Sequence, residues 1–274
     1  MSKQIAVLMT CHNRREKTLN CLRSLFNCSL PEEYALEVFL VDDGSTDNTA
    51  TAVEQNFPAV NIIRGNGKLY WNRGMHLAWT TAAKKQVFDF YLWLNDDVEL
   101  FSRAINDLLN CRKKHDSIIV GTMRSRSEEI PTYGGRKSNR ELIHPNGNPQ
   151  ICDEFNGNLV LIPDAVYKHI GNLDPIFIHS IGDYDYALRA KQNGIKSYIT
   201  PDYLGYCEKH EKLAAWCLPE VPFLKRLKVL YTPLANSQPY YFFRFELRHY
   251  GILTAILHLI TIHLRTIFPR LWKK

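Results

Sequence analysis

Short apolar runs alternate with amphipathic segments along most of the chain. Leu19, Leu22 and Leu25 recur at helical spacing between the first two runs, which predicts a helix there. Helical stretches also separate most of the later runs. This alternation predicts an α/β fold with a Rossmann-like, mostly parallel sheet and helices on both faces. The strand-like runs are residues 5–10, 38–41, 60–63, 90–94 and 118–120.

The pattern becomes irregular after residue 124. Residues 124–150 are polar and rich in Gly, Pro, Ser and Arg, so they predict a long loop or a small irregular subdomain, with a lid as one alternative. Residues 158–162 resume the core as a strand, and Pro163 is placed to open a short helix. A further helix is predicted over residues 184–192, because the glycine that follows would end it.

Polar clusters follow the predicted strands at the points where they end. Asp42 and Asp43 end the second run, and ligands of open α/β sheets bind beyond the carboxyl ends of the strands. A strand-to-helix turn explains part of this cluster, with Gly44 at an unusual backbone angle and Ser45 or Asp47 as a cap. It does not explain two adjacent carboxylates, whose repulsion favours a cation or a donor-rich ligand nearby.

A second acidic cluster, Asp96 and Asp97, follows the run at residues 90–94. Mg²⁺ and Mn²⁺ take oxygen ligands and are usually held by one or two carboxylates together with substrate phosphates. A solvated turn before the next helix would explain either acid alone. Two acidic strand ends in one sheet favour the metal site.

These acidic motifs resemble those of the family-2 glycosyltransferases with the GT-A fold, over roughly residues 3–212. The resemblance implies inverting transfer of a sugar from a UDP- or dTDP-sugar to a glycan hydroxyl, with Mn²⁺ or Mg²⁺ as cofactor. Asp42 or Asp43 would contact the base or ribose. Asp96 would lie on the ribose side, and Asp97 would bind the metal and the diphosphate.

An acidic pair, Asp183 and Asp185, opens the helix predicted before Gly194. The helix dipole stabilises both carboxylates, and capping alone accounts for one of them. In the family that the chain resembles, the matching pair lies beside the acceptor and its first carboxylate is the general base. The resemblance therefore implies that Asp183 is the base and that Asp185 orients the acceptor or the base.

The resemblance also implies donor contacts from two loops and one further metal ligand. The loop residues are Thr10, Asn13, Arg14, Asn66, Asn72 and Arg73. Pairing with an acid is an equal alternative for Arg73. His210 stands where many relatives have a further metal ligand, and a surface histidine is the alternative.

Composition indicates a folded, reduced protein. With 45% apolar and 23% charged residues the chain can bury the core of one large domain, which excludes disorder. The seven cysteines form no Cys-x-x-Cys pair, so neither a zinc ribbon nor a disulfide framework is indicated. The first apolar run is too short for a signal peptide, and we expect a cytoplasmic protein.

The basic residues gather near the C-terminus. The net charge is +6, and residues 223–274 carry many Lys and Arg among aromatics and leucines, against the single acid Glu246. This mixture fits an anionic membrane surface better than a nucleic acid. We therefore expect residues 1–222 to be the catalytic domain and residues 223–274 to be a helical extension, peripheral on the inner face of the plasma membrane near a lipid-linked acceptor.

A long apolar run in this extension, residues 251–268, falls short of a spanning helix because His258, His263 and Arg265 interrupt it. The run predicts an amphipathic helix that lies in the membrane interface, or packs on the catalytic domain or on a second subunit as a homodimer. Its predicted apolar face is Ile252, Ala255, Ile256, Leu259, Ile262 and Thr266.

Two other function classes compete with sugar transfer. A nucleotidyltransferase also needs acids, a metal and a nucleotide pocket, but its basic, glycine-rich N-terminal loop is represented here only by Arg14 and Arg15. A non-catalytic membrane-associated scaffold is the other alternative, and the acids Asp97 and Asp183 argue against it.

Overall fold

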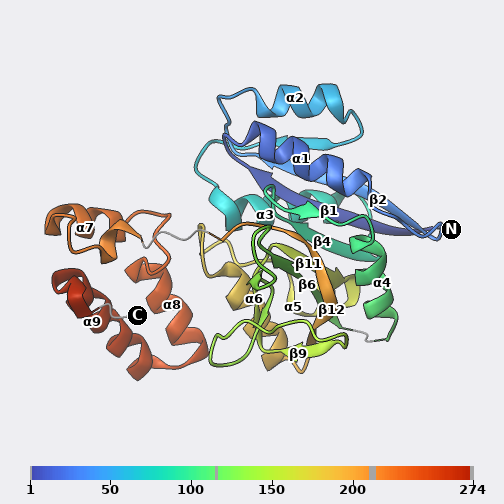
Figure 1. Cartoon of the computed structure of the whole chain (residues 1–274). Helices are drawn as coiled ribbons and strands as arrows, with labels where there is room; N and C mark the ends of the chain where they lie inside the picture. Colours follow the sequence, from blue (N-terminus) through green and yellow to red (C-terminus); the bar gives the residue numbers. More distant parts are fainter. Residues whose placement is uncertain (1, 115–116, 210–213, 272–274) are drawn as a thin grey trace.

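The computed structural model describes residues 2–114, 117–209 and 214–271 (Figure 1). Its centre is a mixed sheet, and a small two-stranded sheet lies outside it. The strands are β1 (Lys3–Cys11), β2 (Tyr34–Asp42), β3 (Asn61–Arg64), β4 (Phe90–Leu94), β5 (Glu99–Leu100), β6 (Ile118–Arg124), β7 (Pro131–Tyr133), β8 (Gly135–Arg136), β9 (Gln150–Cys152), β10 (Glu154–Phe155), β11 (Leu159–Pro163) and β12 (Ser197–Tyr206).

The main sheet follows the order β3-β2-β1-β4-β11-β6-β12-β5. β1 pairs in parallel with β2 and β4, β2 with β3, and β6 with β12. β11 is antiparallel to both of its neighbours, so β6 and β12 run in the same direction as β1. The mostly parallel sheet expected from the sequence is confirmed, with β11, β5, β7 and β9 running against the majority.

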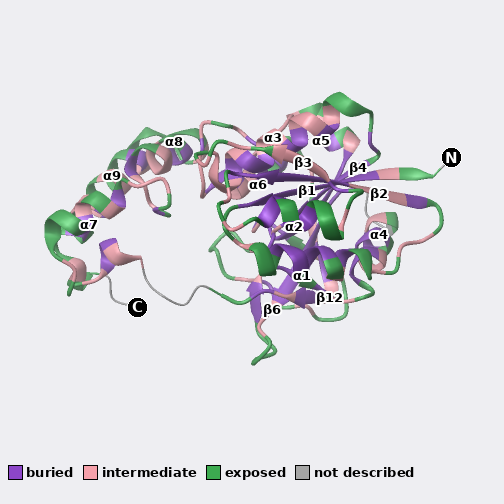
Figure 2. Ribbon diagram, turned by 90° about the horizontal axis from the view of Figure 1, so that it is seen from above, coloured by how far each residue is buried: buried purple, intermediate pink, exposed green. Residues whose placement is uncertain are grey.

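Helices cover both faces of this sheet, as predicted (Figure 2). α1, α2 and α4 lie on one face, and α3, α5 and α6 on the other. The helices are α1 (Arg15–Phe26), α2 (Thr49–Asn56), α3 (Tyr70–Lys85), α4 (Ala104–Lys114), α5 (Asp164–Ile170), α6 (Gly182–Gln192), α7 (Phe223–Leu230), α8 (Pro239–His249) and α9 (Ile252–Ile267), with short 3₁₀ turns at Ala215–Cys217 and Pro269–Leu271.

The period-two pattern of the strands explains the two cores. In β1, Val7 and Met9 pack toward α1, whereas Ala6 and Leu8 pack toward α3 on the opposite face. All four side chains are fully buried. A strand that is covered on both faces has to be apolar throughout, which is why the continuous apolar runs were readable as central strands.

The irregular segment at residues 124–150 contains short strands. β7 pairs with β6, and β8 pairs with β10 in the separate two-stranded sheet. Of the alternatives drawn from the sequence, the small irregular subdomain describes it best. This subdomain presents Arg136 and Arg140 to the cleft described below.

Helices α7, α8 and α9 pack on one another beside the α/β body (Figure 1). No helix in the described ranges is long and apolar enough to cross a membrane. The apolar face predicted for α9 is divided between two environments: Ala255, Ile262 and Thr266 are buried, while Ile252 and Ile256 are exposed.

Two of the basic residues near the C-terminus point into the protein. Arg226 is buried and donates hydrogen bonds to backbone carbonyls, including that of Thr266 (2.9 Å). Arg248 reaches the body of the protein and pairs with Asp174 and Asp185. The exposed basic surface of the extension is therefore smaller than the composition indicated.

Candidate active site

A cleft of about 570 Å³ opens at the edge of the sheet where β4 ends and β11 begins. Four candidates from the sequence line it together: Arg14, which precedes α1; Asp96 and Asp97, which follow β4; and Asp183, in the first turn of α6. Phe245 of α8 closes the cleft on the side of the C-terminal helices. The structure thus brings the two acids after β4, the first acid of α6 and a basic residue from distant segments into one site.

Arg14 bridges the two acids that follow β4. Its Nη1 donates to Asp96 Oδ1 at 3.1 Å and to Asp97 Oδ2 at 2.9 Å. Burial raises the pKa of Asp96 to about 7; the nearby Arg14 opposes this shift, and the charge of Asp97 adds to it. A second positive charge at this point would stabilise the ionised form of both carboxylates.

These two acids have the character of a divalent cation site. Asp96 Oδ2 is buried, and no hydrogen-bond partner for it lies within the described part of the chain. Within those same residues there is no group of three His, Cys, Asp or Glu side chains that could hold a metal alone. The set therefore fits Mg²⁺ or Mn²⁺, which accept one or two carboxylates and take further oxygen ligands from substrate phosphates and water.

Cys207 and Asn158, which lie beside Asp97, were not predicted from the sequence to be site residues. Cys207, at the end of β12, places its Sγ 3.6 Å from Asp97 Oδ1, and Asn158 donates to the same sulfur at 3.5 Å. Burial raises the pKa of the Cys207 thiol, with the charge of Asp97 acting in the same direction, so the sulfur stays protonated. Cys207 therefore holds Asp97 in place as a neutral donor.

Asp183 lies in the first turn of α6, and its carboxylate faces the cleft. Its two oxygens accept backbone N–H groups, from Gly157 at 3.0 Å and from Tyr184 at 2.9 Å. Burial raises the pKa of Asp183 to about 6, although both hydrogen bonds lower it. A carboxylate with this pKa is ionised at neutral pH and accepts protons more readily than an ordinary aspartate.

The backbone at this point is strained. Ile181, the residue before α6, has φ of +78°, a left-handed conformation that a β-branched side chain rarely adopts. Behind it, the ring of Tyr186 packs on Trp93 of β4 with the centroids 5.1 Å apart. This contact ties α6 to the strand that ends in Asp96 and Asp97, so the distance between the two acidic motifs is set by the core.

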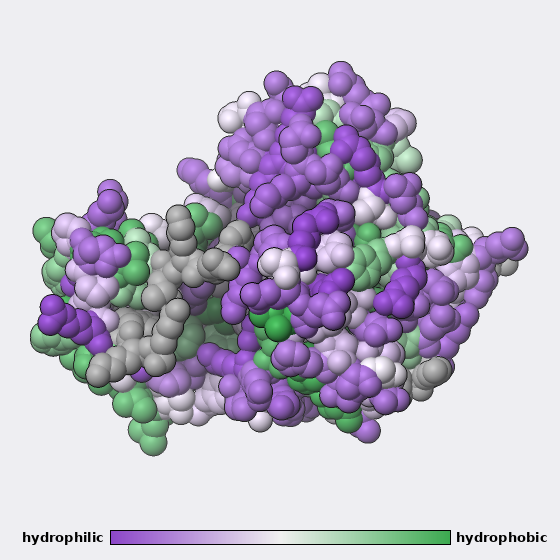
Figure 3. All heavy atoms as spheres, in the orientation of Figure 1, coloured by the Kyte–Doolittle hydropathy of each residue, from purple (hydrophilic) through white to green (hydrophobic). Residues whose placement is uncertain are grey.

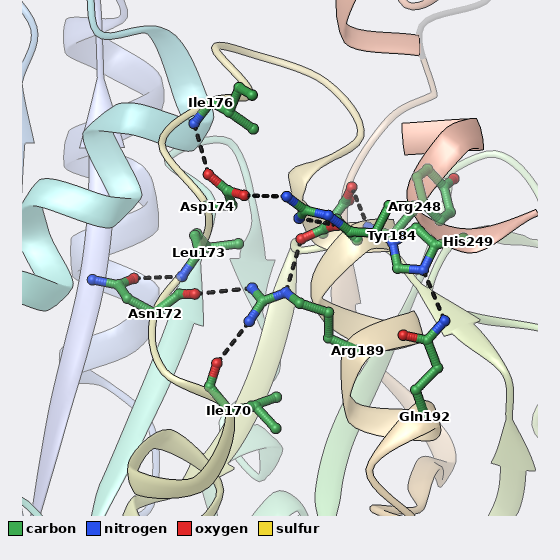
Figure 4. Close-up of polar contacts among 12 residues, drawn as sticks. Ile170, Asn172, Leu173, Asp174, Ile176, Tyr184, Arg189, Gln192, Arg248 and His249 are labelled. Atoms are coloured by element: carbon green, nitrogen blue, oxygen red, sulfur yellow. Dashed lines mark hydrogen bonds and ion pairs between the residues drawn. The ribbon is translucent and has the colours of Figure 1, made fainter. Parts of the chain in front are cut away.

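Asp185 lies elsewhere than expected. Its side chain is 0% exposed and accepts hydrogen bonds from Arg189 (2.9 Å), Arg248 (2.7 Å) and His249 (2.9 Å). Figure 4 shows Arg248 beside Asp174, and His249 beside Gln192 at the end of α6. Burial opposes ionisation, but the His249 hydrogen bond and the two arginines lower the pKa of Asp185. The residue anchors the C-terminal helices and does not line the cleft.

Asp42 and Asp43 shape the loops that follow β2 and β3, and they lie outside the cleft. Asp43 accepts three backbone N–H groups, from Gly67 (2.8 Å), Leu69 (2.9 Å) and Tyr70 (2.9 Å). Asp42 accepts the N–H of Ser45 at 3.0 Å and a bond from Arg64 at 3.3 Å. Gly44 has φ of +70°, as predicted, and a side chain there would meet Gly67 N at 2.9 Å.

The remaining donor-side candidates fall into two groups. Asn13 and Asn66 bind loop backbone: Asn13 Oδ1 accepts the N–H of Thr46 in the loop after β2 at 2.7 Å, and Asn66 Oδ1 accepts that of Lys68 in its own loop at 3.0 Å. Thr10 is buried and lies against α3. His210 lies outside the described residues.

Asn72 and Arg73 hold the loop before α6. Asn72 is fully buried and donates to the carbonyls of Asp174 and Phe177, each at 2.8 Å. Arg73 donates to the carbonyl of Pro175 at 2.8 Å, and within the described residues it forms no ion pair with an acid. Both residues act through the backbone that leads to Asp183.

A match to Glycosyl transferase family 2 covers residues 6–168, which include most of β1, all of β2 to β4 and both acids that follow β4. The chain belongs to glycosyltransferase family 2. Asp183 lies beyond the matched range, yet it shares the cleft with the matched acids. No curated protein sequence matches this family-2 chain.

Solved structures share the GT-A fold of this family-2 glycosyltransferase. S. aureus TarS is 16% identical, with a TM-score of 0.57 over 91% of this chain and 44% of TarS. GalNAc-T7 with UDP, GalNAc and Mn²⁺ is 16% identical, with a TM-score of 0.60 over 76% of this chain and 44% of GalNAc-T7. The mannosyltransferase PcManGT from Pyrobaculum calidifontis, in complex with GDP-Man and Mn²⁺, is 17% identical, with a TM-score of 0.57 over 100% of this chain and 77% of its own. This chain therefore spans less than half the length of the first two proteins.

Proposed function

We propose that this family-2 glycosyltransferase uses Mn²⁺ or Mg²⁺ and transfers a sugar, with inversion, from a UDP- or dTDP-sugar to a glycan hydroxyl in cell-surface polysaccharide synthesis. The main support is the joint position of Asp97 and Asp183 in one cleft. Family membership favours this reaction over nucleotidyl transfer, and a raised pKa at Asp183 favours catalysis over a scaffold.

Each residue of the cleft has its own role in the proposed reaction. Asp97, with Asp96 beside it, would hold a divalent cation that neutralises charge on the departing diphosphate. Arg14 adds a fixed positive charge at the same place. Asp183 accepts the proton of an acceptor hydroxyl as the oxygen attacks the anomeric carbon from the face opposite the diphosphate. The bond from that carbon to the diphosphate oxygen breaks in the same step, so the configuration inverts.

We propose that the nucleotide lies over the ends of β1 and β2. Asp42 and Asp43 fix the loops there through backbone hydrogen bonds, and Asn13 links the loop after β1 to the loop after β2. Preorganised loops leave less entropy to be lost when the donor binds. Thr10 and Asn66 support this side through packing and backbone contacts, whereas Asn72 and Arg73 hold the loop before α6.

We further propose that residues 223–274 hold the enzyme on an anionic membrane surface, near a lipid-linked acceptor. The outer face of α9 is apolar and exposed: Leu253 is 82% exposed, and Leu257 and Ile260 are more than half exposed. Figure 3 shows apolar side chains over the C-terminal helices. Exposed Lys225 and Lys228 of α7 accompany them, a combination that suits anionic headgroups.

Donor binding tests the main proposal. Thermal unfolding is recorded with UDP-, dTDP- and GDP-sugars, with and without Mn²⁺. We expect one nucleotide class to raise the melting temperature, and to do so only with the cation. Stabilisation by nucleoside triphosphates and by none of the nucleotide sugars would support the nucleotidyltransferase alternative instead.

A further inference from the structure

Arg136 is an arginine of the cleft that no function above uses. It lies in β8, and it is partly buried. Its Nε donates to Asn156 Oδ1 at 3.2 Å, and its Nη1 donates to the carbonyl of Arg140 at 2.6 Å. Among the residues that the structure describes, no carboxylate forms an ion pair with Arg136. The cleft therefore contains a fixed guanidinium whose charge is not balanced by an ion pair.

The turn that follows β8 is built to hold this guanidinium. Arg140 adopts a left-handed conformation with φ of +66°, and this aims its carbonyl at Arg136. The charge of Arg140 itself is directed at two buried glutamates, Glu154 at 3.9 Å and Glu246 at 3.8 Å. Such a conformation persists only where the surrounding contacts fix it, and here those contacts include the hydrogen bond from Arg136.

The location of Arg136 separates it from the donor side. Asn156, its partner, also donates to the hydroxyl of Tyr184 at 3.0 Å, and Tyr184 directly follows Asp183. Arg136 also lowers the pKa of Asp183 through its charge, after larger effects of burial and backbone hydrogen bonds. Arg14, by contrast, is bound to Asp96 and Asp97. Arg14 thus belongs to the metal side of the cleft and Arg136 to the side of the base.

We propose that Arg136 binds a phosphate group carried by the acceptor. This inference rests on the proposed function, because it places the acceptor beside Asp183. A guanidinium has five N–H donors, and the two bonds above leave about three free for a ligand. Phosphate offers several oxygens to such a planar fork, and arginine binds it more specifically than lysine does.

The walls around Arg136 fit the sugar that would carry this phosphate. Phe242 of α8 and Tyr184 line the cleft and are only partly buried, and aromatic faces pack against the apolar faces of sugars. The phosphate could belong to a lipid-linked diphosphate or to a phosphodiester polymer. Both sources present the same group to Arg136, so they are distinguished by the probes used.

The test is a binding titration with the donor side filled. Calorimetry is performed on full-length protein saturated with Mn²⁺ and the nucleoside diphosphate that binds best. The probes are N-acetylglucosamine 1-phosphate, neutral methyl N-acetylglucosaminide, a citronellyl diphosphate sugar and a glycerol phosphate oligomer. The variants are Arg136→Gln, Arg136→Lys and the matched control Lys137→Gln, which removes one exposed charge from the neighbouring residue outside the cleft.

We expect Arg136→Gln to weaken binding of the phosphate probes by about tenfold or more, and binding of the neutral sugar by less than about twofold. Arg136→Lys should recover part of the loss, and Lys137→Gln should match the parent. The tighter of the last two probes identifies the source of the phosphate. Equal losses for phosphate and neutral probes, or equal effects of the two glutamine variants, would overturn the proposal. Failure of the parent to bind any nucleoside diphosphate would instead count against the proposed function.

Discussion

Replacing Asp183 with asparagine should make the protein less active and more stable at neutral pH. Burial raises the pKa of Asp183 to about 6, whereas an unfolded aspartate ionises near about 3.9. Each pKa unit corresponds to about 1.4 kcal/mol, so the ionised carboxylate destabilises the fold by at most about 3 kcal/mol at pH 7. The partial exposure of Asp183 to the cleft reduces this destabilisation. Asparagine also loses one backbone hydrogen bond, which is worth about 1 kcal/mol. The expected net gain is about 1 kcal/mol.

The stability gained by Asp183→Asn should increase with pH. Because the pKa of Asp183 is higher in the folded state, the folded protein holds this proton more tightly than the unfolded chain between about pH 4 and pH 6. The contribution of Asp183 to the stability of the parent is therefore greatest at low pH and is lost as the pH rises through 6. The amide does not titrate, so the advantage of Asp183→Asn should grow from pH 5 to pH 7.5.

Urea unfolding of the ligand-free parent and variant at several pH values measures this difference, and turnover is measured on the same samples. We expect turnover to fall by about 100-fold or more with donor affinity nearly unchanged. Asp164→Asn is the control, since Asp164 lies in the first turn of α5 and pairs with Lys168. It should show neither the pH-dependent gain nor the loss of turnover. The reasoning would be refuted if the stability of Asp183→Asn relative to the parent were lower at pH 7.5 than at pH 5.

Three further predictions concern the metal side, the anchor of α8 and the exposed face of α9. Asp97→Ala should abolish the part of donor binding that depends on Mn²⁺, as measured by calorimetry with and without the cation, and metal-independent binding in the parent would contradict the assignment. Arg248→Ala leaves buried Asp185 with two of its three partners and should lower stability by about 1 to 2 kcal/mol in urea unfolding, whereas exposed Arg244→Ala should have almost no effect. Leu253→Glu combined with Leu257→Glu should prevent co-sedimentation with anionic vesicles at low salt without changing donor binding. If the parent does not sediment and instead dissociates from a dimer on this double substitution, the face is a subunit contact.

The sequence predicted the parts of the fold in which local pattern and burial coincide. Strands β1, β2 and β4 are covered on both faces, so they appear as continuous apolar runs, and their polar ends mark the edge of the sheet. Asp96 and Asp97 were found because they stand just beyond the end of β4, whereas Asp183 was found because it opens a predicted helix and matches a motif of the family that the chain resembles. Asp96 and Asp97 lie in the cleft because β4 ends there, and the packing of α6 on β4 brings Asp183 beside them.

The role of Asp185 could not be predicted, because its partners are far away in the chain. Arg248 and His249 lie 63 and 64 residues later, in a segment whose basic composition indicated a membrane surface. Asn72 is a similar case, since it binds carbonyls about 100 residues away. In both cases a polar residue next to a functional motif stabilises the fold, and only tertiary contacts reveal this.

Arg136 was missed for a different reason. It lies in a polar segment without periodicity, where arginines are normally solvated and carry no signal. Its two adjacent glycines, Gly134 and Gly135, were the one available hint, because they allow close approach to Thr122 and Ile199. A pair of glycines alone does not identify the residue that follows them as part of a site.

The most direct test of the central claim is the anomeric configuration of the first product. Proton NMR follows hydrolysis or transfer of the nucleotide sugar that binds best, with Mn²⁺ present, during the first minutes before the free sugar equilibrates. A cleft in which Asp97 serves the departing diphosphate and Asp183 serves the incoming oxygen on the opposite face predicts that the inverted anomer appears first. Its formation should be lost in both Asp97→Ala and Asp183→Asn. Initial appearance of the retained anomer, or undiminished formation of product in Asp183→Asn, would contradict the account.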